Sequence, residues 1–230
     1  MITVKKDAIK IKTPEGMQSA GVLCNVGVVT DNLKYATTLA SIFKTAKFPE
    51  NHVLNVNIPN IGNISGSKSR DISYAFQVTK GVKKIILKCN QSELPISGSY
   101  AFSSSVVEEI DFSEFYPVFT SCGMMFSNAT NLKTIKGELD FSLLSSLENQ
   151  FNGASELVDI QVKKESFSGK LVLSYCSKLS DKSIDSLVNG FADMTGQTAS
   201  VFSVNKSVKA RIEANPVWLA TLTSKNVTLA

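Results

Sequence analysis

The stretches FSNATNLKTI (126–135) and FNGASELVDI (151–160) repeat one pattern, and that pattern organises the chain from Tyr74 to Val162. Four phenylalanines mark it, at intervals of 26, 24 and 25 residues. Each Phe is followed by a Val or Leu 5 or 6 residues later and by an Ile at 8 or 9. The marks are Phe76, Val82, Ile85; Phe102, Val107, Ile110; Phe126, Leu132, Ile135; and Phe151, Leu157, Ile160. A period in the twenties predicts a solenoid, in which each unit buries its apolar face against its neighbours.

Each copy predicts a short helical or 3₁₀ turn around the Phe and a strand that ends at the Ile. The expected strands include VKKIIL (82–87), VVEEIDF (106–112) and LKTI (132–135). Stacked in parallel, they would point Val, Leu and Ile inward and the intervening polar residues outward. The alternative is an irregular α+β domain with accidental spacing, but three marks in register over four copies favour the solenoid. The candidate binding residues are those expected on the outer strand face: Lys83, Lys84, Glu108, Glu109, Lys133, Thr134, Val158 and Asp159.

The segment before the clean repeats predicts two further units. Residues 1–30 are β-branched and alternating, with a turn signal at Pro14-Glu15-Gly16, and predict a β-rich module. Residues 33–58 predict a degenerate first repeat, with a helix from Leu33 to Lys44 and a strand over 53–58. Residues 59–70 are rich in Gly, Asn and Ser and predict a loop.

The segment after Val162 predicts a strand-and-helix cap. Leu139 with Phe141, and Leu171 with Leu173, are expected to close the back of the coil. Helices are expected over 183–194, from Ser207, and again after Pro216, with strands at 201–204 and 226–229. The predicted organisation is therefore a docking module (1–30), a solenoid (31–180) and a cap (181–230).

Composition narrows the function classes. Hydrophobic residues make up 43% of the 230 residues, charged residues make up 19%, and the formal net charge is +4. No basic run marks a nucleic-acid surface, and no apolar run is long enough to cross a membrane. The start, MITVKKDAIKIK, lacks the apolar core of a secretory signal, so export is not expected. Cys24, Cys89, Cys122 and Cys176 are widely spaced, which predicts buried free thiols and no metal or cofactor site.

Catalytic readings find little support in the sequence. His52 is the single histidine, so a nucleophile–His site could use only this residue as its base. Because His52 lies beside a proline turn, it is expected to be a loop residue. Glu109 and Asp111 fall on one face of the expected strand and could form a glycosidase pair, but neighbouring Lys83 and Lys133 offer them ion-pair partners. Nucleotide-binding glycine motifs are absent.

The copies MFSNATNLKTI (125–135) and QFNGASELVDI (150–160) resemble leucine-rich repeats of the surface-antigen type, also called BspA-like or Treponema-type repeats. Ala129 and Ala154 stand where that family has Cys, and its regular Ile-Pro step is missing. The tail, LVLSYCSKLSDKSIDSLVNGFADMTGQTASVFSVN (171–205) with TSKNVTLA (223–230), is similar to repeat proteins of phages and prophages of Gram-positive gut bacteria. The start, MITVKKDAIKIKTPEG (1–16), is similar to tail and baseplate proteins of such phages.

The resemblance implies an α/β leucine-rich-repeat solenoid with a recognition surface, no shared catalytic residues and a place in a virion. The leading hypothesis is a non-enzymatic virion protein of the tail, baseplate or capsid surface. It would contact other virion proteins through residues 1–30, bind a host surface protein or glycan through its repeats, and be present in several copies. The alternatives are a bacterial cell-surface adhesin and, less favoured, a glycan hydrolase.

Overall fold

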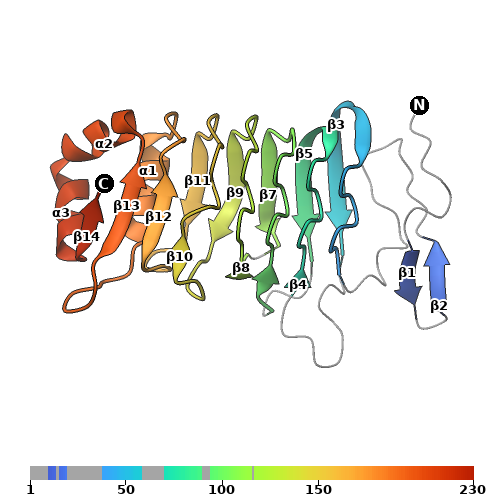
Figure 1. The fold of residues 1–230 in the computed structure, drawn as a ribbon, viewed down its shortest axis with the longest axis horizontal. Helices are drawn as coiled ribbons and strands as arrows, with labels where there is room; N and C mark the ends of the chain where they lie inside the picture. Colours follow the sequence, from blue (N-terminus) through green and yellow to red (C-terminus); the bar gives the residue numbers. More distant parts are fainter. Residues whose placement is uncertain (1–9, 14–15, 20–37, 59–69, 90–93, 116) are drawn as a thin grey trace.

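A computed structural model of the chain describes residues 10–13, 16–19, 38–58, 70–89, 94–115 and 117–230. The fold is α/β, with parallel sheets and few helices (Figure 1). The strands are β1 (Lys10–Thr13), β2 (Gly16–Ser19), β3 (Lys47–Asn57), β4 (Arg70–Asp71), β5 (Lys80–Lys88), β6 (Ile96–Ser97), β7 (Glu109–Glu114), β8 (Phe119–Ser121), β9 (Thr134–Leu139), β10 (Ser146–Leu147), β11 (Asp159–Val162), β12 (Lys170–Leu173), β13 (Ser200–Val204) and β14 (Val227–Leu229). The helices are α1 (Asp181–Gly190), α2 (Lys206–Glu213) and α3 (Pro216–Ser224).

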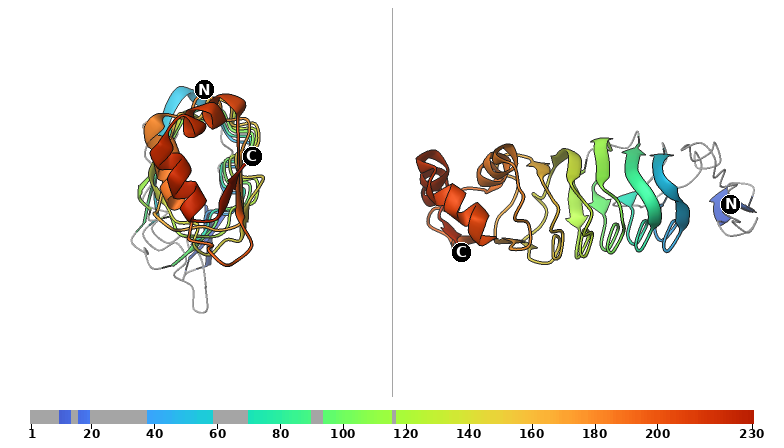
Figure 2. Two further views of the ribbon diagram at one scale, coloured as in Figure 1. Left: turned by 90° about the vertical axis from the view of Figure 1, so that its left-hand side faces the viewer. Right: turned by 90° about the horizontal axis from the view of Figure 1, so that it is seen from above.

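The strands of the repeats stack in chain order. A five-stranded parallel sheet has the order β11-β9-β7-β5-β3, and a three-stranded parallel sheet has the order β4-β6-β8. Each circuit of the chain thus adds one strand to each sheet, and we call one such circuit a coil. Viewed along the long axis, the coils superimpose on one outline (Figure 2). This arrangement is compatible with the expected repeat solenoid.

The marker phenylalanines form one continuous column inside the coils. Their rings stack nearly in parallel, with centroids 5.2–5.8 Å apart and interplanar angles of 7–18° from Phe76 through Phe102 and Phe126 to Phe151. Phe43 adds a fifth ring, 5.4 Å from Phe76, so the first repeat is present although its sequence is irregular. All five rings are 0–2% exposed. The prediction that these residues occupy equivalent positions is confirmed.

The turn around each Phe is not the helical or 3₁₀ turn that the sequence predicts. The residues two before and two after the ring adopt positive φ in successive coils, as at Tyr100 (58°) and Ser104 (55°) on either side of Phe102. Gly153, with φ +77°, takes the second of these places after Phe151. A left-handed residue reverses the chain and prevents helix propagation. The backbone therefore folds into consecutive tight turns.

Hydrogen bonds in these turns alternate between the same coil and the next one. Ala101 N–H and Ser103 N–H donate within the coil, to Gly98 O and Tyr100 O. Phe102 N–H and Ser104 N–H donate to Met125 O (2.9 Å) and Ser127 O (2.8 Å) of the next coil. Every second amide thus ties one coil to the next, which satisfies the backbone and fixes the rings in register.

Several predictions for the N-terminal part change. Residues 38–44 form the Phe43 turn instead of the end of a helix, and residues 33–37 lie outside the described part of the chain. Pro49 and His52 lie within β3, which is longer than the strand expected at 53–58. Strands β1 and β2 pair antiparallel, as the turn signal predicts; the rest of residues 1–30 lies outside the described residues.

In the C-terminal region the chain continues to form coils, but helices take the place of some of the strands. Strands β10, β12, β13 and β14 form a four-stranded parallel sheet, and α1, α2 and α3 replace the strands opposite it (Figure 2). The expected strands and the helix that begins at Pro216 are confirmed, while the helix expected over 183–194 lies at Asp181–Gly190. Phe141, Leu171 and Leu173 are buried at the back of the coil, as predicted, whereas Leu139 is buried as the last residue of β9 in the five-stranded sheet, so its predicted place at the back is wrong.

Helix α1 closes the open edge of the five-stranded sheet. The Ser183 hydroxyl accepts from Ile160 N–H (2.9 Å) and donates to Val158 O (2.9 Å). The Ser186 hydroxyl accepts from Val162 N–H (2.9 Å) and donates to Val162 O (3.3 Å). Two serines three residues apart on one helix face therefore replace the hydrogen bonds that the next strand would make.

Candidate functional site: the outer sheet face

The predicted binding residues form two lateral rows across the five-stranded sheet. The first row is joined by backbone bonds: Glu108 N–H donates to Lys83 O, Lys133 N–H to Glu108 O, and Val158 N–H to Lys133 O. The second row follows the strand register: Lys84 pairs with Glu109, Glu109 with Thr134, and Thr134 with Asp159. The structure thus brings all eight residues onto one face. Three of them are exposed (Lys83, Lys133 and Asp159), and the other five are half-exposed.

Charges along the first row alternate in sign. Lys133 Nζ lies 2.8 Å from Glu108 Oε2, and Lys178 Nζ lies 2.6 Å from Glu156 Oε1 one coil further on. Lys83 also attracts Glu108 electrostatically, and Glu156 attracts Lys133. The row therefore reads Lys83, Glu108, Lys133, Glu156, Lys178, and each charge faces the opposite charge on the neighbouring coil.

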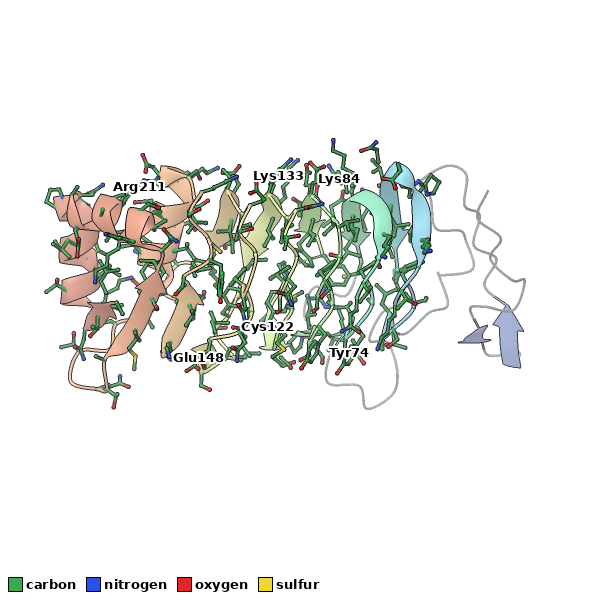
Figure 3. The ribbon with its side chains drawn as sticks, turned by 45° about the horizontal axis from the view of Figure 1, so that its top comes forward. Tyr74, Lys84, Cys122, Lys133, Glu148 and Arg211 are labelled. Carbon is green, nitrogen blue, oxygen red and sulfur yellow. The ribbon has the colours of Figure 1, made fainter. Side chains whose placement is uncertain are left out.

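A second ion-pair cluster lies beside this row (Figure 3). Glu109 Oε1 is 2.8 Å from both Lys84 Nζ and Lys136 Nζ, and Asp111 Oδ2 is 3.8 Å from Lys84 Nζ. Glu109 and Asp111 lie on the same face as predicted, but the prediction that Lys83 and Lys133 pair with them is wrong. Lys133 pairs with Glu108 instead, and Lys84 and Lys136 hold Glu109.

These contacts keep the carboxylates ionised. Burial raises the pKa of Glu109, but hydrogen bonds from Lys136 and Lys84 outweigh burial and leave this pKa below its usual value. Burial likewise raises the pKa of Asp111, but the hydrogen bonds from Ser113, including that from its N–H (3.0 Å), and the charges of Lys84 and Lys136 together outweigh burial, so this pKa is also lowered. A glycosidase needs one carboxyl whose pKa is raised, so that it can act as the acid. This pair is therefore poorly suited to that role.

The other groups considered for chemistry have packing partners. His52 stacks on Phe48, with ring centroids 5.3 Å apart, and burial lowers its pKa. Cys89, Cys122 and Cys176 are free and buried, as predicted, and Cys24 lies outside the described residues. Burial raises the pKa of both Cys122 and Cys176 to about 12. These thiols are therefore protonated and shielded at neutral pH.

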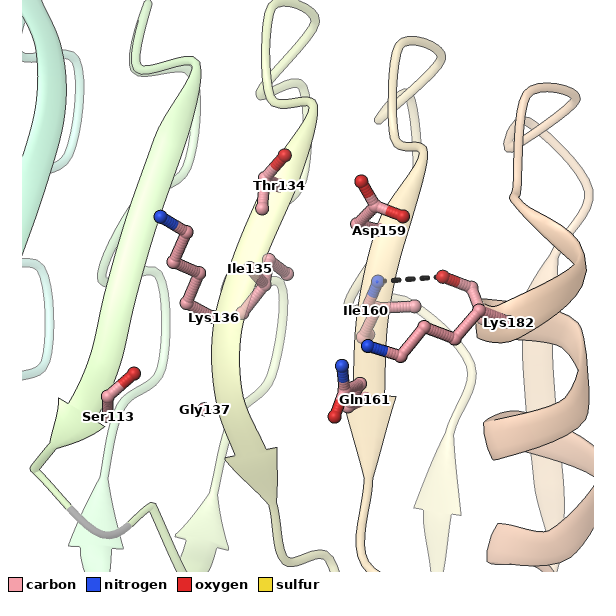
Figure 4. Close-up of a pocket in the computed structure, with 10 residues that line it drawn as sticks. Ser113, Thr134, Ile135, Lys136, Gly137, Asp159, Ile160, Gln161 and Lys182 are labelled. Atoms are coloured by element: carbon pink, nitrogen blue, oxygen red, sulfur yellow. Dashed lines mark hydrogen bonds between the residues drawn. The ribbon is translucent and has the colours of Figure 1, made fainter.

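The outer face is hollowed in two places. A depression of about 300 Å³ near β3 and β5 includes Lys83, Glu108 and Asn131 in its lining. A larger one, about 400 Å³, lies where β9, β11 and α1 meet (Figure 4). We call this larger hollow the β11 groove; its rim includes Thr134, Lys136, Asp159, Gln161 and Lys182. Thr134 and Asp159 are predicted binding residues, whereas the other three were not.

Two features of the structure could not be predicted from the sequence. Lys182 was assigned to the cap, because nothing in the sequence shows that α1 lies alongside β11. Arg70, expected in a loop, is fully buried, and its Nε donates to Leu94 O (2.5 Å) while its guanidinium lies over the Phe115 ring. An Arg at the end of a Gly- and Ser-rich stretch carries no sequence signal of burial.

Within the described ranges, no cluster of three or more His, Cys, Asp or Glu residues could hold a metal ion. In the same ranges, no helix has both the length and the apolarity needed to cross a membrane. No protein-family description, curated protein or solved structure matches this chain.

Proposed function

We propose that this chain is a leucine-rich-repeat-type solenoid and that it acts, without catalysing a reaction, as a structural and binding component of a phage or prophage particle. The observation that carries the proposal is the outer sheet face. Its two rows of side chains are held in place by the strand register and by ion pairs from coil to coil. A surface already held in one conformation loses little entropy when a partner binds, so it suits recognition.

The stacked coils support the solenoid part of the proposal. Each coil contributes one inward Phe, one inward strand face and one outward polar row, so every unit repeats the same division between core and surface. The outward row differs in sequence from coil to coil, and such variation can carry binding specificity. The predicted members Lys83, Lys84, Glu108, Glu109, Lys133, Thr134, Val158 and Asp159 belong to that row.

The virion location is supported by the resemblance of the repeats, the start and the tail to phage and prophage proteins. Residues 1–30 would attach the chain to other virion proteins, and the repeats would contact further particle proteins, a host surface protein or a host glycan. Several copies would surround a symmetry axis of the particle.

Particle incorporation tests this function. The tagged full chain and a chain lacking residues 1–30 would be expressed during particle production in a Gram-positive host that carries the phage or prophage. We expect the full chain to sediment with purified particles and the shortened chain to remain in the cell extract. Because Trp218 is the single tryptophan and lies in the C-terminal region, its fluorescence checks that the shortened chain still folds.

A folded shortened chain that enters particles as well as the full chain would disprove the docking role of residues 1–30. Absence of the full chain from particles, together with its detection on intact cells, would favour the adhesin alternative. Glu213→Gln is the matched control, because Glu213 is exposed on α2, outside residues 1–30 and the outer sheet face, and this variant should enter particles normally. The Glu109→Gln variant should leave any effect on glycans unchanged, and loss of glycan cleavage in this variant would favour the hydrolase.

A further inference from the structure

The β11 groove differs from the rest of the outer face in whether its polar side chains are bonded to other protein groups. Glu108, Glu109 and Lys133 are held in ion pairs between coils. In the part of the chain that the structure describes, the side chains of Thr134, Gln161 and Lys182 make no hydrogen bond or ion pair. Polar groups without protein partners converge here on a concave surface, which is the arrangement of a ligand site.

One glycine of β9 is part of the groove lining. Gly137 lies in β9 with φ +90°, and a Cβ at this position would lie 2.9 Å from the carbonyl carbon of Phe112. No other residue type fits there without strain. Glycine at this position lets β9 approach the backbone of β7 closely, and residue 137 lines the groove with backbone atoms alone.

The walls are polar and carry both donors and acceptors. Lys136 points away from β11, toward β7 and its partner Glu109, whereas Lys182 extends from α1 over β11 toward Gln161 (Figure 4). Asp159 accepts one hydrogen bond from the Ser180 hydroxyl (2.9 Å), which leaves its remaining acceptor positions free. Thr134 and Gln161 can each donate and accept.

The charges of the groove balance. Lys136 is neutralised by Glu109, and the ammonium of Lys182 is matched by the carboxylate of Asp159 on the same rim. An anionic ligand would be repelled by Asp159, and a cationic one by Lys182. Among the described residues that line the groove none is aromatic, and the two isoleucines, Ile135 and Ile160, are buried, so an apolar ligand would gain little burial. A neutral molecule with many hydroxyl groups fits this combination of donors, acceptors and charge.

We propose that the β11 groove binds a neutral saccharide unit, with the hydroxyls of the sugar bonded by Asp159, Gln161, Thr134 and Lys182. This inference rests on the proposed recognition function of the outer face and names its ligand class. The groove holds about 400 Å³, which is within the range of small-ligand sites and admits one or two sugar units. A site that is open and lacks a stacking ring binds weakly, so we expect a Kd on the order of 1 mM per copy. Several copies on one particle would strengthen attachment to a polymer.

The test is a titration of the full chain, labelled with ¹⁵N, with glucose, galactose, rhamnose and N-acetylglucosamine. Amide shifts should concentrate on β9, β11 and the first turn of α1 for at least one of these sugars. Gln161→Ala and Lys182→Ala should each weaken that binding by about tenfold, the effect of losing one hydrogen bond to a ligand. Both side chains are exposed and without partners, so both variants should fold as the parent does.

Gln197→Ala is the matched control, because Gln197 is an exposed glutamine in the loop before β13, and it should leave the shifts unchanged. The inference is overturned if no sugar produces shifts up to its solubility limit, or if the shifts persist unchanged in both groove variants. It is also overturned if glucuronate or inorganic phosphate binds more tightly than the neutral sugars, because the charge argument would then be wrong. Any of these failures leaves the particle-incorporation result, and so the proposed function, intact.

Discussion

The repeats and the C-terminal region are both built around phenylalanine rings, but the rings are arranged differently. From Phe76 to Phe151 they stack with interplanar angles of 7–18°. In the second column, at the back of the coil, the angles are 78° between Phe141 and Phe167, 55° between Phe167 and Phe191, and 57° between Phe191 and Phe202. Rings stack in parallel where every coil presents its ring from the same turn. In the second column the rings come from unlike segments, since Phe141 follows β9, Phe167 precedes β12, Phe191 follows α1 and Phe202 lies in β13.

The two regions also satisfy their backbone groups differently. Within the repeats, an amide of one coil bonds a carbonyl of the next, as with Phe102 N–H and Met125 O. At the end of the sheet no further strand follows β11, and the hydroxyls of Ser183 and Ser186 take over. A regular stack thus needs no special side chains, whereas its end depends on two particular ones.

The largest effect should come from removing a ring in the centre of the column. Phe102 is fully buried between Phe76 and Phe126, and Phe102→Ala should lower the free energy of unfolding by about 3–5 kcal/mol. Phe202→Ala, in the C-terminal region, removes one tilted contact with Phe191 and should cost less. Urea unfolding followed by circular dichroism measures both. Equal losses would show that ring geometry does not distinguish the two regions energetically.

An exposed aromatic serves as the control for both ring variants. Tyr175 is 56% exposed, so Tyr175→Ala should change the free energy of unfolding by less than about 0.5 kcal/mol. A large loss at this position would mean that the effect of Phe102→Ala cannot be assigned to the buried column.

The next effect should come from the serines that close the sheet. Ser183→Ala leaves Ile160 N–H without its partner, whereas Val158 O keeps the hydrogen bond from Ser180 N–H, and a buried group left unpaired costs about 1–3 kcal/mol. Trp218 reports on the adjoining helices, because its Nε1 donates to Asp185 of α1 (2.9 Å). Its fluorescence should show a lower urea midpoint for Ser183→Ala, and amide exchange at Ile160 should become faster.

Ser145→Ala is the matched control, since Ser145 is exposed and its hydroxyl has no partner among the described residues. Unchanged exchange at Ile160 in the Ser183 variant would show that α1 does not act as the closing element.

The smallest effect should be the pH dependence of the outer face. The pKa values of Glu108, Glu109 and Asp111 lie below their usual values in the folded chain, chiefly because lysines and backbone amides bond their ionised forms. Their contribution to stability is therefore full above the pKa values of the unfolded chain. It is lost as the pH falls from there through the lower folded values. Urea midpoints should decrease below about pH 4.5.

Glu109→Gln should make that decrease shallower, because one of the titrating groups is gone. Glu213→Gln is the control, since Glu213 is exposed on α2 and makes no ion pair within the described part of the chain. An identical pH profile for Glu109→Gln and the parent would show that the ion pairs between coils do not contribute to stability.

The sequence predicted the regular elements well, because burial repeats along the chain where the structure repeats. The spacing of Phe76, Phe102, Phe126 and Phe151 predicted their common column, and the outward rows followed from alternation on the strands. The turn around each Phe was mispredicted as helical, since the spacing of four residues between the left-handed positions 100 and 104 resembles a helical period. Tyr100 and Ser104 gave no signal of positive φ, which is unusual for such residues.

The sequence by itself determined the coil period, the buried column and the polar rows, because each depends on residues at fixed spacing within one coil. Only the tertiary structure decided that Lys136, and not Lys133, pairs with Glu109, that two serines of α1 close the sheet, and that Lys182 reaches over β11. These contacts join residues of different coils or elements. Their partners are set by the register of neighbouring strands and by the placement of a helix, and spacing along the chain carries no record of either.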